Sequence, residues 1–285
     1  MTIVMDKIDW KNSLGNKVRE KLSEPYEGLP IDEPKFNFYY LNPNAFSGFM
    51  KQSRNIIWFV NNHLNKFELM ENLFAKPQIV IKSSFEDNEL HKFYFEENIN
   101  LILNSILHNE KKEKLRRIKK SYSKSKDLEK RFGIKLKYPS AYKTVKDTSN
   151  FIWIQKNISK GHMNIISYSI SKKHLKVFTD KTIISIRDSI GKLYVPGRLK
   201  GSYMITEKSY KPFFYKTKKE NKLLYITKGT WEVYNDFMAG PFINFFIEDL
   251  NNNRWVVIEG FTFAPSIKKR DYMFELETIL NTIEF

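Results

Sequence analysis

The sequence predicts an α+β protein made of two α/β layered domains that are joined by a long, basic helix. Three observations predict this fold class. Segments with apolar residues at helical spacing alternate with short β-type runs over the first hundred residues. From about residue 134 the pattern becomes mostly that of strands, so we expect a domain boundary near Gly133. The chain has 285 residues, of which 41% are apolar and 15% aromatic, and this is enough to build two ordinary cores.

The first expected domain, residues 1–132, alternates strands and helices in a βαβαβ-type order. A helix is predicted over Ser13–Leu22, where apolar residues recur at i, i+4 and i+8. Pro43–Gln52 is predicted to be a short helix with proline near its start. The segment Asn61–Lys76 stays open between a loop with one helical turn and an edge strand. The other expected strands are Thr2–Met5, Phe36–Leu41, Asn55–Val60 and Gln78–Ser83.

A long helix is expected to end this first domain. It begins at Glu86 or Asp87 and carries a buried apolar stripe. If it continues to Tyr122, it is about 55 Å long at ~1.5 Å per residue. The alternative is a break near Asn109.

The second expected domain, residues 133–285, is a mostly antiparallel α+β sandwich. A short helix over Ser125–Phe132 precedes it, and Gly133 ends that helix as its C′ residue. Two more helices are expected, one capped by Thr179 or Asp180 and a final amphipathic one over Lys269–Ile283. The remaining apolar runs are predicted strands: Ile134–Tyr138, Tyr142–Lys146, Phe151–Gln155, Asn164–Ser169, Ser202–Thr206, Phe213–Thr217, Lys222–Val233, Phe242–Asp249 and Arg254–Phe263.

The excess positive charge is concentrated in one segment. Residues 111–137 carry about +10 of the formal net charge of +16. Three interpretations remain open: a solvated helix face, a contact with an anionic membrane surface, and a contact with an acidic protein or polymer. Nucleic acid is disfavoured, because only 9 of the 48 basic residues are arginine, the residue that reads phosphates and bases bidentately. The candidate interaction surface consists of Lys111, Lys112, Lys114, Arg116, Arg117, Lys119, Lys120, Lys124 and Lys126.

No catalytic, cofactor or metal-binding motif is present in the sequence. The absence of cysteine excludes disulfides, thiol catalysis and cysteine-ligated metals. Phosphate-binding glycine loops and a GxSxG elbow are missing. No apolar run approaches the ~18 residues of a membrane span, and the N-terminus does not read as a signal peptide. We therefore predict a protein without catalytic residues, cofactor or metal. The histidines lack metal-ligand spacing; they are His63, His91, His108, His162 and His174.

One segment stands out as a candidate functional loop. It comprises Trp231, Asp236, Phe237, Met238, Gly240 and Pro241. The alternative is that Asp236 organises a turn and that Gly240-Pro241 only sets up the next strand. A pocket that gathers Asp236 and Glu207 with Trp231 and Arg187 would instead favour an uncharacterised hydrolase.

Short stretches along nearly the whole chain carry a family resemblance. They are Ala45-Phe46-Ser47-Gly48, Ala75-Lys76-Pro77-Gln78, Lys146-Asp147-Thr148-Ser149-Asn150-Phe151-Ile152-Trp153, Arg187-Asp188-Ser189, Tyr194-Val195-Pro196-Gly197, Gly201–Glu207, Asp236–Phe242, Gly260-Phe261-Thr262-Phe263-Ala264-Pro265 and Lys269-Arg270-Asp271-Tyr272. Together they resemble domain-of-unknown-function family 4837, a family of envelope lipoproteins from Bacteroidota. The order of elements after Gly133 is also similar to the PsbP/Mog1-type sandwiches, which are adaptor and assembly modules.

The resemblance implies a lipoprotein of the outer membrane or periplasm, although a signal peptide and a lipobox cysteine are absent from this chain. It supplies no catalytic residues. We therefore expect a non-catalytic cell-envelope protein that acts as a binding, scaffold or accessory component, is anchored to the membrane in its full-length form, and has a protein partner in the envelope. The alternatives are a basic protein that binds an anionic polymer or nucleic acid, and the hydrolase described above.

Overall fold

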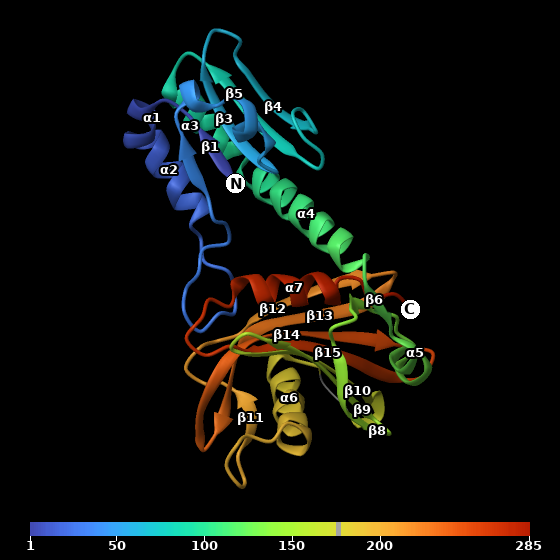
Figure 1. Cartoon of the computed structure of the whole chain (residues 1–285). Helices are drawn as coiled ribbons and strands as arrows, with labels where there is room; N and C mark the ends of the chain where they lie inside the picture. Colours follow the sequence, from blue (N-terminus) through green and yellow to red (C-terminus); the bar gives the residue numbers. More distant parts are fainter. Residues whose placement is uncertain (175–177) are drawn as a thin grey trace. The chain divides into compact units, whose positions relative to one another are not determined.

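The computed structural model describes residues 1–174 and 178–285 (Figure 1). The chain forms two compact units, and the predicted mixed α/β class is confirmed. The first unit comprises Met1–Pro25 and Pro34–Arg116, and the second comprises Tyr26–Glu33 and Arg117–Phe285. We expected a boundary near Gly133. The units divide upstream of it, because Leu128 and Phe132 pack in the core of the second unit.

The first unit contains a five-stranded sheet in the order β2-β1-β3-β5-β4. The pairs β1–β2, β1–β3 and β3–β5 are parallel, and β4 pairs antiparallel with β5 at one edge. The edge strand that we considered for Asn61–Lys76 is therefore confirmed. The strands are β1 (Thr2–Val4), β2 (Tyr39–Leu41), β3 (Asn55–Asn61), β4 (Lys66–Glu71) and β5 (Ile79–Phe85).

Four α-helices begin in this part of the described chain: α1 (Lys7–Lys11), α2 (Ser13–Leu22), α3 (Asn88–Glu97) and α4 (Ile99–Ile118), whose last two residues belong to the second unit. The predicted bounds of α2 are confirmed, and its residues Leu14, Val18 and Leu22 pack against the sheet. The short helix expected over Pro43–Gln52 consists of two 3₁₀ turns, η1 (Pro43–Ala45) and η2 (Gly48–Gln52).

The expected long helix is broken at Asn98, and the alternative break near Asn109 is wrong. The side chain of Asn98 donates to the carbonyl of Tyr94 at 2.8 Å and ends α3 there. Asn109 lies inside α4 and does not break it. Its side chain donates to Asn55 Oδ1 at 3.0 Å, outside the helix, and so does not compete with the hydrogen bonds of the helix backbone. The prediction of a helix to Tyr122 is also wrong, since α4 ends at Ile118.

The second unit is built on an eight-stranded sheet in the order β11-β13-β14-β15-β10-β9-β8, with β12 also paired to β13. Every described strand pair in it is antiparallel, as predicted. Its strands are β8 (Lys143–Thr148), β9 (Phe151–Ile158), β10 (Gly161–Ser171), β11 (Tyr203–Thr206), β12 (Phe213–Lys219), β13 (Lys222–Tyr234), β14 (Asp236–Asp249) and β15 (Arg254–Phe263). The expected strand Ile134–Tyr138 is limited to β7 (Lys137–Pro139), which forms a separate ribbon with β6 (Tyr122–Lys124).

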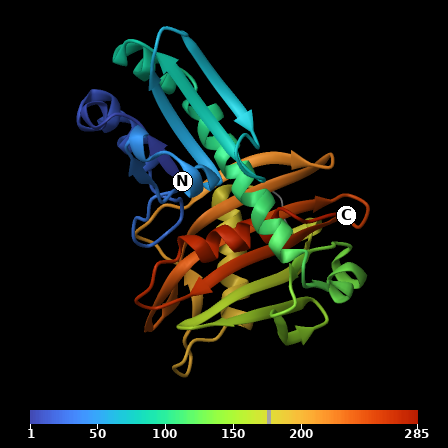
Figure 2. The same ribbon diagram turned by 45° about the horizontal axis from the view of Figure 1, so that its top comes forward.

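Helices cover both faces of this sheet and complete the predicted sandwich (Figures 1 and 2). Helix α7 (Arg270–Leu280) packs on one face and α6 (Asp180–Tyr194) on the other. The predicted cap of α6 is confirmed, because Thr179 forms a reciprocal capping box with Thr182. Helix α5 (Lys126–Phe132) ends at Gly133, which has the expected left-handed conformation with φ 70°.

The segment Tyr26–Glu33 belongs to the second unit although it lies early in the sequence. The hydroxyl of Tyr26 donates to Glu277 on α7 at 2.5 Å. The carboxylate of Glu33 accepts from the backbone nitrogen atoms of Lys269 and Arg270 at 2.6 and 3.2 Å. An acidic side chain at a helix N-terminus neutralises its unpaired N–H groups and its dipole, so this segment stabilises α7.

Candidate functional site

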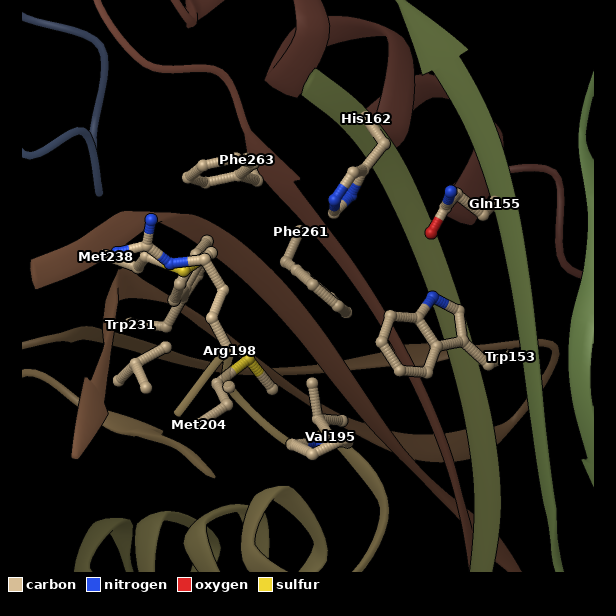
Figure 3. Close-up of a pocket in the computed structure, with 13 residues that line it drawn as sticks. Trp153, Gln155, His162, Val195, Arg198, Met204, Trp231, Met238, Phe261 and Phe263 are labelled. Carbon is tan, nitrogen blue, oxygen red and sulfur yellow. The ribbon is translucent and has the colours of Figure 1, made fainter. Parts of the chain in front are cut away.

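A cavity of about 240 Å³ lies in the second unit, on the face of the sheet that α6 covers (Figure 3). Strands β9, β10, β11, β13, β14 and β15 contribute to its walls, together with the segment that follows α6. The lining residues are Trp153, Gln155, His162, Val195, Pro196, Gly197, Arg198, Met204, Trp231, Val233, Met238, Phe261 and Phe263.

The walls of this cavity are mainly aromatic. Phe261 lies between the two indoles, with ring centroids 5.9 Å from Trp153 and 6.0 Å from Trp231. Two methionines, Met204 and Met238, complete the apolar surface. Aromatic rings and flexible thioethers adapt to apolar groups of several shapes, so this interior suits an apolar guest.

Arg198 and Asp236 form an ion pair at the cavity. The guanidinium of Arg198 donates from Nε and Nη2 to the two carboxylate oxygens of Asp236 at 3.0 and 2.7 Å. This pairing lowers the pKa of Asp236 below its ordinary value. A carboxylate whose proton affinity is reduced is a weak general base at neutral pH. Asp236 therefore anchors Arg198.

The hydrogen bonds around His162 define its tautomer. The indole Nε1 of Trp153 can only donate, and it does so to Asn164 Oδ1 at 2.9 Å. The amide nitrogen of Asn164 then faces His162 Nδ1 at 2.9 Å, so Nδ1 must be the acceptor. Burial lowers the pKa of His162 and favours the neutral ring. The neutral imidazole consequently carries its proton on Nε2, and Figure 3 shows this ring between Phe263 and Gln155.

The candidate functional loop is a β-hairpin, because β14 already begins at Asp236. Asn235, with φ 61°, makes the turn from β13. Phe237 and Met238 have no partners between the pairs Glu232–Ala239 and Val233–Asp236, so they form a bulge.

This bulge separates its two residues. Met238 lines the cavity, whereas the side chain of Phe237 is fully exposed at 103%. Trp231 lines the cavity from β13. Gly240 lies where a Cβ atom would be only 2.2 Å from the carbonyl oxygen of Thr262. Pro241 lies opposite Thr230 in the ladder. The structure therefore arranges all six predicted loop residues around one hairpin beside the cavity.

The residues of the hydrolase hypothesis are not gathered around this cavity. Trp231 lines it and Asp236 is bound to Arg198, but Glu207 and Arg187 are not among the lining residues. Glu207 accepts from the backbone nitrogen atoms of Ser209 and Tyr210.

Arg187 belongs to a buried ion pair. Its Nε and Nη2 atoms donate to Glu259 at 3.0 and 2.8 Å, and the two residues are 1% and 0% exposed. Arg187 Nη1 donates to Thr206, and Asn244 donates to Glu259. Each charge is therefore matched inside the fold by hydrogen-bond partners.

The histidines do not form a shared site among the described side chains. His91 is buried and bonded to Ser83 at 2.7 Å, while His63 is exposed beside Glu86 and His108 is exposed. The side chain of His174 lies outside the described part of the chain. Within the described residues, no group of three or more His, Cys, Asp or Glu residues has an arrangement that could hold a metal ion.

The basic segment is divided between the units. Lys111, Lys112, Lys114 and Arg116 belong to the first unit, and Arg116 is paired with Glu113 at 2.6 Å. The remaining candidates belong to the second unit and have exposed side chains: Arg117, Lys119, Lys120, Lys124 and Lys126.

Sequence reasoning identified Trp231 and Met238 but missed the rest of the cavity. The available signal was the set of stretches that carried the family resemblance. Trp153, Val195, Met204, Met238 and Phe261 all come from those stretches. Strand pairing brings these residues together, and their spacing along the chain does not reveal that they are neighbours.

None of the described helices combines the length and apolar character that crossing a bilayer requires.

Two family models together match most of the chain. The model described as "Domain of unknown function (DUF4837)" matches residues 121–282, and the one described as "Domain of unknown function (DUF8532)" matches residues 1–119. The predicted resemblance to family 4837 is therefore confirmed. No curated protein matches the chain.

Two solved structures are similar to part of the chain. One is the Ran-binding protein Mog1p of Saccharomyces cerevisiae, with 9% identity, a TM-score of 0.35, and coverage of 53% of this chain and 89% of that one. The other is a protein of Bacteroides thetaiotaomicron, with 11% identity, a TM-score of 0.27, and coverage of 53% of this chain and 44% of that one. The match thus spans less than half of the Bacteroides protein.

Proposed function

Because the chain belongs to the family described as a domain of unknown function, DUF4837, whose name states no activity, we propose its function from the site itself. The protein is a non-catalytic binding component of the cell envelope and serves as an accessory or scaffold part of an envelope assembly. The partner is another protein, which engages the second unit at the aromatic cavity. The envelope location rests on the sequence resemblance described above.

The observation that carries this proposal is the combination of an apolar cavity lined by aromatic rings with nearby carboxylates that already form ion pairs with arginine. Asp236 is held by Arg198, and Glu259 is held by Arg187 beneath α6. Acid–base chemistry requires an acid or base whose pKa suits proton transfer near the operating pH. The low pKa of Asp236 works against that role. A cavity with these walls is better suited to holding a group than to transforming it.

Affinity capture from native membranes tests the proposal with three forms of the full-length protein. Met238→Trp fills the cavity from its edge. Leu250→Trp adds the same indole at a side chain that is 69% exposed, beyond the opposite end of β14, and is the matched control. We expect the wild type and the Leu250 variant to capture one partner protein in stoichiometric amount. The Met238 variant should capture at least ten-fold less of this partner protein.

Two results would contradict the proposed function. One is the absence of any stoichiometric partner protein in repeated captures of the wild type. The other is recovery of the protein in the cytosolic fraction of gently lysed cells, because an envelope component should fractionate with the envelope.

A further inference from the structure

We infer that the cavity receives one large apolar side chain of a partner polypeptide, and that His162 Nε2 donates a hydrogen bond to a backbone carbonyl beside that side chain. This inference rests on the proposed function and names the chemistry of the partner. The size of the cavity, the polarity of its edge and the neighbouring exposed ring each contribute to the argument.

The size of the cavity matches a single side chain. Its volume of about 240 Å³ lies below the ~300 Å³ at which pockets for drug-sized ligands usually begin. Trp231 and Phe261 are 2% and 3% exposed and close its inner wall. A small pocket with a buried inner wall and an open mouth accommodates the end of one apolar group.

The polar atoms at the edge are mostly donors. His162 Nε2–H has no partner among the described atoms, because the tautomer derived above assigns only Nδ1 to Asn164. Arg198 uses Nε and Nη2 for Asp236 and keeps Nη1 unassigned. The Arg198 side chain is 68% exposed, so water can satisfy its Nη1 donor. The donor of the half-buried His162 ring calls for a guest that brings an acceptor, and peptide carbonyls are acceptors. Asp236 compensates the charge of Arg198, so the edge does not require a guest with a full negative charge.

An exposed apolar surface continues from the cavity. Phe237 precedes the cavity residue Met238 and is 103% exposed. Tyr234, at the other end of the same turn, is 48% exposed and stacks on Tyr203 at 5.1 Å. Protein interfaces are rich in such aromatic residues, and the residues that contribute most binding energy fill well-packed pockets. The cavity and the hairpin tip therefore form one docking surface for a polypeptide.

A titration of the full chain with blocked amino acids tests the inference. The probes are N-acetyl-phenylalanine amide, N-acetyl-leucine amide and N-acetyl-lysine amide, and the readout is the indole N–H signals of Trp153 and Trp231 in two-dimensional NMR spectra. We expect saturable binding of the phenylalanine probe with a dissociation constant on the order of 1 mM. The lysine probe should bind at least ten-fold more weakly.

Variants locate the binding and identify the hydrogen bond. Met238→Trp should abolish binding of the phenylalanine probe, and Leu250→Trp should leave it unchanged. His162→Ala should weaken binding about five-fold, which is the effect of one lost hydrogen bond. His162→Gln, which retains an N–H donor, should recover part of this loss. Circular dichroism of each variant verifies that it has folded.

Each remaining outcome has a distinct meaning. Binding of sodium decanoate without binding of the amides would assign the cavity to a lipid chain and overturn the inference. Saturable binding that Met238→Trp does not affect would place the guest elsewhere and also overturn it. If the amides fail to bind but the partner protein is still captured in a cavity-dependent way, the inference is wrong and the proposed function stands. If the amides bind while no partner protein is captured, the proposed function is wrong.

Discussion

The buried pair of Arg187 and Glu259 shows how single residues stabilise the second unit. Each charge depends on the other, because both side chains are inaccessible to water and can be balanced only from within the fold. The guanidinium also lies over the ring of Phe242 at 3.8 Å, which adds a cation–π contact.

Replacing Arg187 with Met should lower the free energy of unfolding by about 3–5 kcal/mol, because Glu259 then stays buried without a counter-charge. The double variant Arg187→Met with Glu259→Leu should recover most of this loss, since it removes both charges. Urea unfolding followed by tryptophan fluorescence measures both values. A loss below about 1 kcal/mol in the single variant would show that the pair is not desolvated as described.

His91 makes the stability of the first unit depend on pH. Burial lowers the pKa of His91, and the nearby charge of Asp9 opposes this shift only in part. The unfolded chain takes up the proton near pH 6.5, while the folded chain does so only at lower pH. The stabilisation is therefore complete above pH 6.5 and is lost as the pH falls through the pKa of the folded state.

The variant His91→Gln should flatten this pH dependence. We expect the wild type to lose up to about 1.4 kcal/mol per pH unit within the window, and the variant to lose less. Urea unfolding at pH 7.5, 6.5 and 5.5 provides the comparison. An equally steep loss in both proteins would mean that other groups cause it.

At the scale of elements, Gly240 lets β14 approach β15 and Trp231 closely. A Cβ atom at this position would be 2.2 Å from the carbonyl oxygen of Thr262 and 3.0 Å from the indole of Trp231. Gly240→Ala should therefore destabilise the protein by about 1–3 kcal/mol and distort the cavity wall.

Gly201→Ala is the matched control for this prediction. Gly201 has φ 79° and open space around it, so its variant carries only backbone strain of about 1–2 kcal/mol. Thermal unfolding compares their stability, and the phenylalanine probe compares their binding. We expect Gly240→Ala to lose binding and Gly201→Ala to keep it. Normal binding by Gly240→Ala would show that the wall relaxes.

Local signals predicted many elements of the fold, and the failures have physical causes. Helix α2 and strand β15 have the predicted bounds, because both carry regular apolar patterns. The start of β14 was missed because Gly240-Pro241 reads as a turn. Thr230 on β13 lies opposite Pro241, but the carbonyl of Thr230 accepts a hydrogen bond from the backbone nitrogen of Glu207. It therefore needs no N–H from Pro241, and proline is tolerated there. The ladder with β15 begins only at Phe242, so no bond requires the missing N–H of Pro241.

The candidate site was less predictable than the fold. Trp231 and Met238 belong to the predicted functional loop, but Arg198 and His162 reach the cavity from distant parts of the sequence. The role of Arg198 follows from its ion pair with Asp236, and that of His162 follows from the chain of hydrogen bonds through Asn164. Neither feature can be read from sequence spacing.

At the scale of the whole molecule, the excess charge predicts an interaction with anionic membranes. Lys119, Lys120 and Lys124 are exposed in the second unit and form none of its described ion pairs. Each lysine near an anionic surface contributes about 1 kcal/mol of attraction. The full chain should therefore bind vesicles that contain phosphatidylserine at least ten-fold more tightly than neutral vesicles at low salt, and added salt should weaken this binding.

Charge reversal of these three lysines to Glu should remove the preference. The same reversal of Lys143, Lys211 and Lys218, which are also exposed in the second unit, is the matched control. Vesicle sedimentation measures all three proteins. Equal losses in the two triple variants would indicate that net charge, and not the basic segment, drives binding.

The bulge of β14 has one more consequence. Phe237 and Met238 share a peptide bond but face opposite environments, water and the cavity. A partner that binds the side chain of Phe237 therefore restrains the backbone that positions Met238. If binding at Phe237 raises the affinity of the cavity for its guest by some factor, then thermodynamic reciprocity requires that an occupied cavity raises the affinity for Phe237 by the same factor. Two weak contacts at one turn can thus report each other's occupancy without any movement of the rest of the sheet.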